Sequence, residues 1–388
     1  MGVASQTFNN ALPEPSFFRR YVAAPDPGQP SREWHTSPVI DMAAYHFSWA
    51  WVLVPLLFTN SDDVYFYIYA LIMGAILAHR HYGLPYAYLD DGVFKKYKRQ
   101  LTWFPLLCVL LFAASPLLLM REDRGSVLSK ALGAIVFFSL LWNIWHTYMQ
   151  KFGILRLYLA KEAKAALKTP AWVDKYFLFC WIPLFFSYMG PKHKSEILKY
   201  GVDIRATALA IIRLMERHQK YLVLPSILIA VGGVGLWLWY EWRTQRFRNR
   251  ARLSAATGTL LISTALLWTD PVTAFTAFAF SHAVEYMVFV WAFQRRFYYL
   301  PRPQPPLMQR LLSHSRSWYA GFTLILVAVG AIEVLWGETI FTDMNPISFA
   351  GMTGAQWFFY YAVYQSFVHF HMDGFLWKMR RPEVSNYV

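Results

Sequence analysis

Residues 356 to 382 read QWFFYYAVYQSFVHFHMDGFLWKMRRP, an apolar run that ends in charged residues. The run is long enough for a membrane-spanning helix. Four polar side chains nevertheless lie near its end: Gln365, His369, His371 and Asp373. Ionisable side chains at membrane depth are costly and usually mark a functional site. The central question is therefore whether other helices bring matching groups to the same depth.

The composition of the whole chain is that of an integral membrane protein. Of its 388 residues, 56% are hydrophobic and only 15% are charged, against about 25% charged in soluble domains. The 37 Lys and Arg outnumber the 23 Asp and Glu, but the basic residues lie in short loops between apolar runs. There they set topology and contact anionic lipid head groups, so nucleic acid is not an expected partner.

The hydropathy pattern predicts an all-α fold, a polytopic transmembrane helical bundle of about ten spans. The predicted spans cover residues 39–59, 64–82, 101–120, 131–150, 176–190, 221–240, 253–269, 272–293, 317–337 and 346–370. The fifth is short and contains Pro183, so it either crosses or forms a re-entrant or interfacial segment. Three parts are expected: a flexible cytoplasmic tail at 1–38, the bundle at 39–377 and a basic cytoplasmic tail at 378–388.

The loop charges predict the orientation of the bundle. Basic loops follow spans two, four, six and eight, and the positive-inside rule places them in the cytoplasm. Both termini are then cytoplasmic, and the bacterial inner membrane is the expected location. The basic segment 191–220 would lie outside under this topology. Its apolar spacing indicates an amphipathic segment on the membrane surface.

Seven histidines share one predicted depth. They lie on five spans, in the inner half of the bilayer or at its inner edge: His46, His79, His81, His146, His282, His369 and His371. Imidazole is the commonest metal ligand, and metals in helical bundles are bound by side chains from facing helices. The shared depth therefore predicts a metal site. The other four histidines, His35, His193, His218 and His314, are expected in loops or at an interface.

The spacing of neighbouring polar residues supports this site. Glu285 lies three residues after His282, on the same helix face. Gln365, His369 and Asp373 recur every four residues, so one can bind a metal while its neighbours orient the ring. Asn143 and Gln150 lie near the face of His146 in a similar way. Histidines and carboxylates without thiolates favour iron or manganese.

This arrangement loosely resembles that of histidine-dependent membrane oxygenases. The shared features are intramembrane histidines on several helices, an HxxE pair and a His-rich last span. The group includes membrane desaturases and hydroxylases, and bacterial membrane dioxygenases that cleave β-carotene to retinal. The resemblance implies non-haem iron bound by histidines on different helices, matched by position in the bundle to His46, His146, His282 and His369.

The HxxxH and HxxHH boxes of the desaturases and hydroxylases do not occur in this sequence. Two HxH pairs stand instead, at residues 79–81 and 369–371. Helical positions two apart diverge by about 200°, so both members bind one ion only where the helix has ended or unwound. Gly83 and Gly374 would favour such unwinding.

The predicted function is that of a membrane oxidoreductase. One or two non-haem iron ions with open positions would activate O2 as co-substrate. A hydroxylase, desaturase or dioxygenase reaction would act on a fatty acyl, lipid or isoprenoid/carotenoid substrate from the bilayer, with an electron-donor protein as a further partner. His46, His146, His282 and His369 are the expected ligands. The residues that complete the site are His79, His81 and His371, with Glu285 and Asp373 as catalytic carboxylates that bind the metal or orient histidines.

Two other functions remain open from the sequence. A proton-coupled transporter could use His282, Glu285 and Asp373 as a relay. A b-type haem protein could use two of the histidines, such as His46 and His282, as axial ligands. Single histidines at helix ends are also often only hydrogen-bonded there, and Glu285 could pair with Arg295 or Arg296.

Overall fold

The computed structural model describes fourteen stretches of the chain: residues 33–58, 62–119, 127–161, 168–192, 205–244, 246–265, 267–298, 306–313, 323–324, 326–328, 330–331, 348–349, 352–378 and 381. Within them the regular structure is helical, apart from one antiparallel pair of two-residue strands. The predicted all-α class is therefore confirmed. Most of the tail predicted at 1–38 and most of the span predicted at 317–337 lie outside the described residues.

The first half of the chain forms a short broken helix and then three long ones. Its elements are α1 (Pro38–Ile40), η2 (Asp41–His46), α2 (Ala50–Phe58), α3 (Asp62–His81), α4 (Leu84–Leu89), α5 (Asp91–Leu119) and α6 (Val127–Ala160). Helix α6 extends ten residues beyond the span predicted at 131–150. Helix α5 begins ten residues before the span predicted at 101–120, so the basic residues expected in a loop there are helical.

The second half begins with short helical pieces and ends with long helices. Its elements are α7 (Ala171–Phe179), α8 (Ile182–Leu184), η3 (Phe185–Met189), α9 (Gly190–Lys192), α11 (Arg205–Arg243), η4 (Arg246–Arg248), α12 (Arg250–Ala265), α13 (Pro271–Phe297), α14 (Leu307–Ser313), β1 (Ser348–Phe349), β2 (Met352–Thr353) and α16 (Gly354–Leu376). The fifth predicted span is thus a chain of short helices broken near Pro183.

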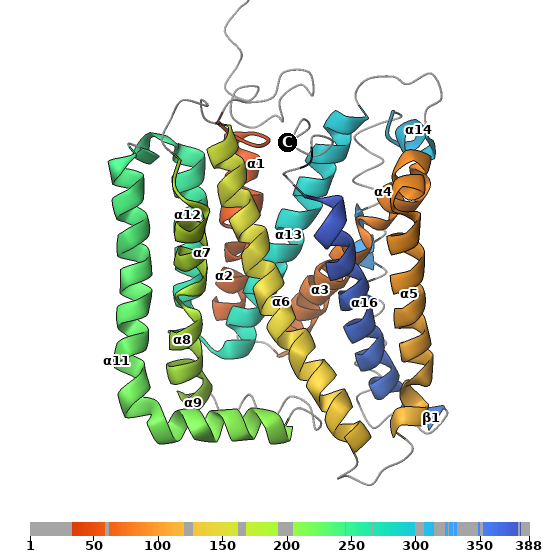
Figure 1. The fold of residues 1–388 in the computed structure, drawn as a ribbon, viewed down its shortest axis with the longest axis horizontal. Helices are drawn as coiled ribbons and strands as arrows, with labels where there is room; N and C mark the ends of the chain where they lie inside the picture. The colour runs from red at the N-terminus through yellow and green to blue at the C-terminus, as the bar shows by residue number, and fades with distance from the viewer. Residues whose placement is uncertain are drawn as a thin grey trace, which may run out of the picture.

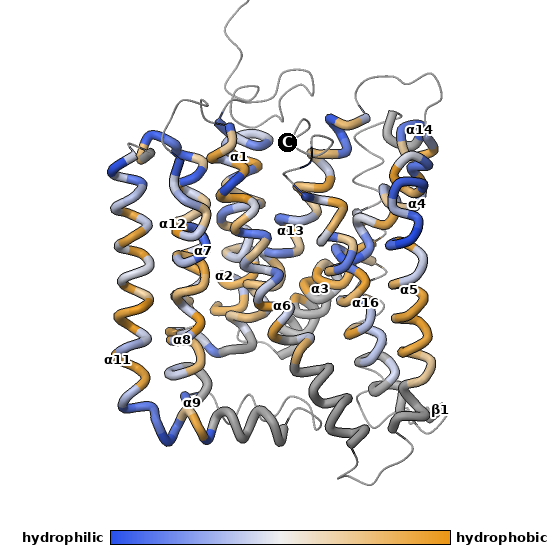
Figure 2. The backbone as a smooth tube through the Cα atoms, viewed as in Figure 1, coloured by the Kyte–Doolittle hydropathy of each residue, from blue (hydrophilic) through white to orange (hydrophobic). Residues whose placement is uncertain are grey.

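The long helices lie side by side, and α6 crosses the others diagonally (Figure 1). The first part of α11 runs across the lower end of the molecule before the helix turns upward. This is the region in which the sequence predicts an amphipathic segment lying flat. In Figure 2 the upright part of α11 and the lower part of α5 are mostly hydrophobic, with hydrophilic residues nearer their upper ends.

Both α5 and α11 expose large apolar side chains. These include Trp103, Leu107, Val109 and Leu110 on α5, and Leu224, Leu228, Val231 and Trp242 on α11. Exposed apolar patches of this kind mark surfaces that contact other proteins or lipid. Their place on the outside of the bundle agrees with the apolar composition of the chain.

Two helical stretches among the described residues are long and apolar enough to cross a membrane, Arg213–Arg243 and Thr273–Phe297. The pair Pro38–His46 and Ala50–Phe58 would make a third, bent by 60° at its break. These helices are consistent with a membrane protein. The predicted count of ten spans is not confirmed by them and stays a prediction.

The bend in the first span follows a π-helix. In η2 the Asp41 carboxylate accepts hydrogen bonds from the backbone N–H groups of His35 and Thr36, at 2.6 and 2.9 Å. It also accepts from the Tyr158 hydroxyl of α6 at 2.9 Å. Single-turn π segments occur often where side chains need special placement. Here the segment turns Asp41 and His46 into the interior, where both are buried.

Local sequence signals fix the start of α13 and α5. Asp270 accepts a hydrogen bond from the Thr273 N–H at 2.8 Å, and Pro271 occupies the first turn of α13. An aspartate cap followed by proline is a strong helix start. The Asp90 side chain accepts from the N–H groups of Gly92 and Val93 and so caps α5. Asp90 thus marks the break between α4 and α5.

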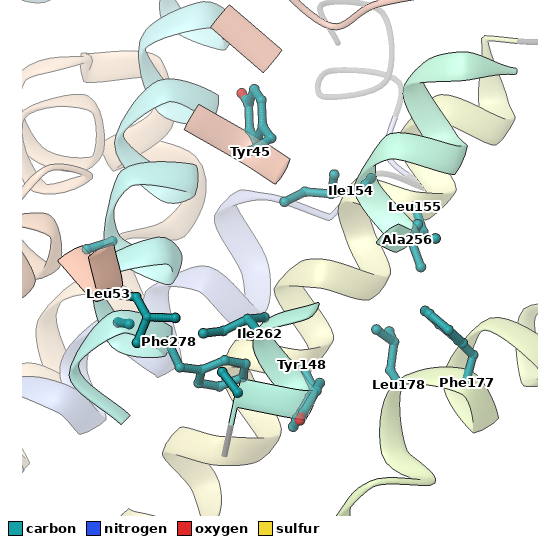
Figure 3. Close-up of a cluster of buried hydrophobic side chains, with 14 of the residues drawn as sticks. Tyr45, Leu53, Tyr148, Ile154, Leu155, Phe177, Leu178, Ala256, Ile262 and Phe278 are labelled. Atoms are coloured by element: carbon teal, nitrogen blue, oxygen red, sulfur yellow. The ribbon is translucent and has the colours of Figure 1, made fainter. Parts of the chain in front are cut away.

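The main apolar core joins α2, α6, α7, α12 and α13 (Figure 3). Leu53, Ile262, Phe278 and Tyr148 come from four of these helices and lie close together in the figure. All four are buried. This core fixes α6 against α13, the two helices that carry His146 and His282.

A buried charged cluster lies beside this core. The Arg252 guanidinium is fully buried and lies 2.6 Å from an Asp174 oxygen and 2.8 Å from a Glu241 oxygen. Arg156 reaches the other Asp174 oxygen at 3.2 Å. The cluster ties α12, α7, α11 and α6 together. A buried ion pair of this kind is costly to break, because removing one partner leaves an uncompensated charge.

Helix α12 approaches η2 through Gly258. A Cβ atom built at Gly258 would lie 1.9 Å from the carbonyl oxygen of His46. No side chain fits there without moving one of the two backbones. The glycine is therefore required by the packing of α12 against η2.

Replacing Gly258 by alanine is expected to destabilise the protein by about 1–3 kcal/mol, as overpacking of a filled interior does. Gly153 on α6 is the matched control, because a Cβ there meets nothing within 4 Å. Gly153→Ala should stabilise by about 0.5–1 kcal/mol through helix propensity. Unfolding of both variants in detergent would measure the difference, and equal effects would contradict the packing argument.

Candidate metal centre

Four helices bring four histidines together. His79 lies near the end of α3, His146 and His282 lie in the middle parts of α6 and α13, and His369 lies in the second half of α16. The helices meet in a closed cycle, since α3 contacts α13, α13 contacts α6, α6 contacts α16, and α16 contacts α3. The sequence predicted that histidines from separate helices would share one depth, and these four do meet.

The imidazole rings follow the same cycle. Neighbouring ring centroids are 4.9 Å apart for His79 and His282, 5.0 Å for His282 and His146, 5.3 Å for His146 and His369, and 4.8 Å for His369 and His79. Across the cycle, His282 and His369 are 6.2 Å apart. All these pairs meet edge to face, so in each pair the edge of one ring contacts the face of the other.

These rings are buried without the hydrogen bonds that buried nitrogens normally have. The four histidines are between 3% and 8% exposed. Nε2 of each ring is buried without a hydrogen-bond partner, and so is Nδ1 of His282. An unmade hydrogen bond costs about 1–3 kcal/mol per buried group. Several such nitrogen atoms around one point indicate a binding site for a group that accepts nitrogen lone pairs, such as a metal ion.

The tautomer of His79 can be assigned from its neighbour. Its Nδ1 contacts the backbone carbonyl oxygen of Ile76. A carbonyl only accepts, so Nδ1 carries the proton and Nε2 carries the lone pair. A ring held through Nδ1 with Nε2 free is the usual form of a metal-binding histidine.

Asp373 lies on one side of the histidine cycle. Its Oδ2 is 3.3 Å from Nε2 of His146 and 3.4 Å from Nε2 of His369. Potential ligand atoms form two groups, and within each group the atoms lie within 4.8 Å of one another. One group comes from His79, His282 and His369, and the other from His146, His369 and Asp373. Imidazole nitrogens and a carboxylate are donors for iron or manganese, so these residues fit such an ion.

His46, the expected metal ligand from the first predicted span, makes hydrogen bonds outside the cycle. Its Nε2 lies 3.0 Å from the hydroxyl of Tyr158 and its Nδ1 lies 2.8 Å from the hydroxyl of Ser254. Tyr158 donates its proton to Asp41, so Nε2 must donate to Tyr158 and Nδ1 accepts from Ser254. Neither nitrogen keeps a free lone pair, and the structure does not bring His46 to the four-histidine cycle.

The second histidine of each HxH pair also lies apart from the cycle. Helix α3 continues through residue 81 and α16 continues to residue 376, so neither helix unwinds at its pair. His81 contacts the side chain of Gln365. His371 stacks on Phe104, with ring centroids 4.1 Å apart. Two residues that are two positions apart on an unbroken helix point in different directions, so only one histidine of each HxH pair reaches the cycle.

Glu285 belongs to a separate ion pair. Its carboxylate lies 2.6 Å from Lys151 Nζ and accepts from Ser281 at 2.8 Å and from Gln150 at 3.1 Å. Gln150 also donates to the backbone carbonyl of His282. Glu285 thus pairs with a lysine of α6 instead of Arg295 or Arg296. It reaches the cycle only through the backbone of α13.

The remaining histidines have other settings. The structure buries His35 completely and stacks it on Phe289, with centroids 5.8 Å apart, so it is not an exposed loop residue. His218 is exposed on α11. His193 and His314 lie outside the described residues.

Sequence reasoning missed two residues beside the cycle. The Tyr286 ring lies 5.0 Å from the His369 ring, and its hydroxyl accepts a hydrogen bond from Trp377 Nε1 at 3.0 Å. Tyr286 is four residues after His282, on the same helix face. That spacing was the available signal. Trp377 stands at the end of the apolar run, where an aromatic residue of the membrane interface is expected, and no sequence signal pairs it with Tyr286.

Comparison with known proteins assigns no family. No protein-family model matches the chain, and searches of curated proteins and of solved structures find no match. Fold and site alone therefore define the class: an all-helical protein with a buried four-histidine cycle between four helices.

Proposed function

We propose that the protein is a membrane-embedded non-haem iron oxygenase that acts on a lipophilic substrate. The observation that carries the proposal is the cycle of four buried histidines with unpartnered Nε2 atoms on four helices. Iron bound there would supply O2 activation, provided that some coordination positions stay open. The loose resemblance to histidine-dependent membrane oxygenases agrees with this assignment.

The membrane setting is part of the same proposal. About ten spans would cross a bacterial inner membrane, with both termini cytoplasmic and the centre in the inner half of the bilayer. Exposed apolar side chains on α5 and α11, together with the apolar composition, support lipid contact. A fatty acyl chain, another lipid or an isoprenoid/carotenoid would reach the centre laterally. Anionic head groups and an electron-donor protein would be the other partners.

The residues of the chain would divide the work as follows. The four histidines hold the ion, and the Ile76 carbonyl fixes the orientation of the His79 ring. Gln150 bonds the His282 carbonyl and so fixes α13 against α6. Burial of all four rings excludes bulk water from the centre, which favours controlled oxidation of an apolar substrate. Asp373 faces two of the rings and either binds the ion or orients them.

The haem alternative receives less support from the geometry. The widest pair, His282 and His369, has ring centroids 6.2 Å apart, but the rings of His79 and His146 lie 4.8 to 5.3 Å from both and occupy the space that a porphyrin plane would need. The sequence-based pair for haem, His46 and His282, is divided between two sites because His46 is bonded to Tyr158 and Ser254.

A proton-coupled transporter is the second candidate. The observation in its favour is the Lys151–Glu285 pair, which is nearly inaccessible to solvent on both sides. Buried ionisable pairs at membrane depth often belong to proton relays. The pair lies next to the histidine cycle, so a relay through Glu285 and His282 would use the same helices.

Metal content decides between the two candidates. Detergent-purified protein, prepared without chelator, should contain near-stoichiometric iron by mass spectrometry. Its absorption spectrum should lack a Soret band. Protein without bound metal would contradict the oxygenase proposal, and proton-coupled transport would then be tested in liposomes.

A further inference from the structure

Two overlapping sets of ligand atoms raise the question of how many ions the centre holds. His369 belongs to both sets, with His79 and His282 in one and with His146 and Asp373 in the other. A neutral imidazole nitrogen has one lone pair and serves one ion. Ligand nitrogens lie about 2 Å from a metal, so the atoms of each set, which lie within 4.8 Å of one another, are close enough to surround one ion. Because the two sets share His369, two ions could not both use the same His369 nitrogen, and this sharing favours one ion between the sets.

We propose that the centre holds a single ion with Asp373 as its fifth ligand, and that Tyr286 and Trp377 are positioning residues that hold Asp373 in place. The proposal rests on the proposed metal-dependent function. It assigns the carboxylate, whose role as ligand or orienter was open, and it gives a role to two aromatic residues beside the centre.

The placement of Asp373 supports its role as a ligand. Its Oδ2 faces Nε2 of both His146 and His369, while its Oδ1 is buried without a hydrogen-bond partner. A buried carboxylate oxygen without a donor is costly. A cation at the centre would satisfy the carboxylate and the two imidazoles together.

Charge balance supports the same role. Four neutral imidazoles contribute no charge to offset a divalent ion. Glu285, the other buried carboxylate near the cycle, already pairs with Lys151 at 2.6 Å. Among the described residues, Asp373 is thus the carboxylate placed to offset the charge of the ion.

Tyr286 and Trp377 form a short hydrogen-bonded chain beside Asp373. Trp377 Nε1 donates to the Tyr286 hydroxyl at 3.0 Å. An indole N–H only donates, so the Tyr286 proton remains for an acceptor. The Tyr286 ring lies 5.0 Å from the ring of His369, whose Nε2 is 3.4 Å from Asp373 Oδ2, so Asp373 is the carboxylate beside this hydroxyl. A carboxylate that accepts this proton keeps its orientation toward His146 and His369.

Gly83 makes room for this chain. A Cβ atom at Gly83 would lie 2.6 Å from the Tyr286 hydroxyl. The glycine just after α3 therefore has a packing role here, distinct from the helix unwinding predicted from the sequence. Because His79 lies four residues earlier, the turn that carries Gly83 also brings Tyr286 beside the metal ligands.

Cobalt(II) titration of the metal-free full-length protein in detergent tests the proposal. Cobalt absorption in the visible range reports coordination number and ligand type without any catalytic turnover. The wild type should bind one Co²⁺ per chain with a five-coordinate spectrum. Asp373→Asn should change that spectrum and weaken binding. Asp373→Glu should restore part of the wild-type spectrum.

Tyr286→Phe removes only the hydroxyl. It should weaken Co²⁺ binding by about 10–100-fold, as loss of a group that orients a ligand does, and shift the spectrum. Tyr45→Phe is the matched control, because Tyr45 is equally buried and its hydroxyl has no partner. Its spectrum and affinity should equal those of the wild type.

Three outcomes would overturn the inference, and they are distinguishable. Two Co²⁺ per chain would contradict the single ion. An unchanged spectrum and affinity in Asp373→Asn, with one Co²⁺ bound, would remove Asp373 as a ligand while leaving the four-histidine site intact. No Co²⁺ binding by the wild type would overturn the metal-dependent function together with this inference.

Discussion

His282→Ala is expected to reduce bound iron to background while the helices still form. Within the cycle, His282 is the histidine whose two ring nitrogens are both buried without a hydrogen-bond partner, and it neighbours His79 and His146. Loss of a group that only orients a metal ligand costs about 10–100-fold in affinity, so loss of the ligand itself should cost more than about 100-fold. His146→Ala should have the same effect.

The measurement is iron per chain by mass spectrometry, with circular dichroism on the same samples to check helix content. His371→Ala is the matched control, because His371 lies on the same helix as His369 but stacks on Phe104 outside the cycle. It should retain wild-type iron. Wild-type iron content in both His282→Ala and His146→Ala would remove the assignment of the centre.

Arg252→Ala is expected to cause a large loss of stability. It leaves Asp174 and Glu241 buried without the guanidinium that contacts both. Breaking a buried ion pair by removing one partner costs about 3–5 kcal/mol. Because the cluster joins α6, α7, α11 and α12, the substitution should weaken the packing of all four helices, including α6, which carries His146.

Unfolding in detergent, followed by tryptophan fluorescence, measures this effect. Arg250→Ala is the control: Arg250 lies two residues earlier on the same helix and is exposed. It should change stability by no more than about 0.5 kcal/mol. A similar small change in Arg252→Ala would show that the buried cluster does not stabilise the fold.

The parts of the fold that follow from hydropathy were predictable from the sequence. The predicted span at 272–293 lies within α13, and the predicted span at 253–269 overlaps most of α12. The histidines could be placed by depth because helix position along the membrane normal follows from residue number alone. Four of the seven histidines at that depth do form the cycle.

Rotation about each helix axis was harder to predict. His46 and His79 have similar predicted depths, but the π-helix turns His46 toward Tyr158 and Ser254. No sequence feature of residues 41–46 predicts a π-helix. By contrast, the sequence alone shows that the two histidines of an HxH pair point about 200° apart on a helix. If both helices had been assumed to continue unbroken, His81 and His371 would have been excluded from the predicted site.

Helix ends account for the missed partner of Glu285. The sequence ended span four at residue 150, which left Lys151 in a cytoplasmic loop. Helix α6 continues to Ala160, so Lys151 lies within the helix and reaches Glu285. A basic residue near the end of an apolar run can be an anchor at the membrane surface or part of a buried ion pair within the helix. The sequence does not distinguish these two roles, whereas the packed structure does.

The order of the four histidines along the chain has a consequence for biogenesis. The first of these histidines is residue 79 and the last is residue 369, on a helix that packs directly against α3. If the four histidines bind a metal as proposed, a growing chain offers at most three of the four ligands until α16 has been made. The complete centre could then form only after α16 has packed against α3.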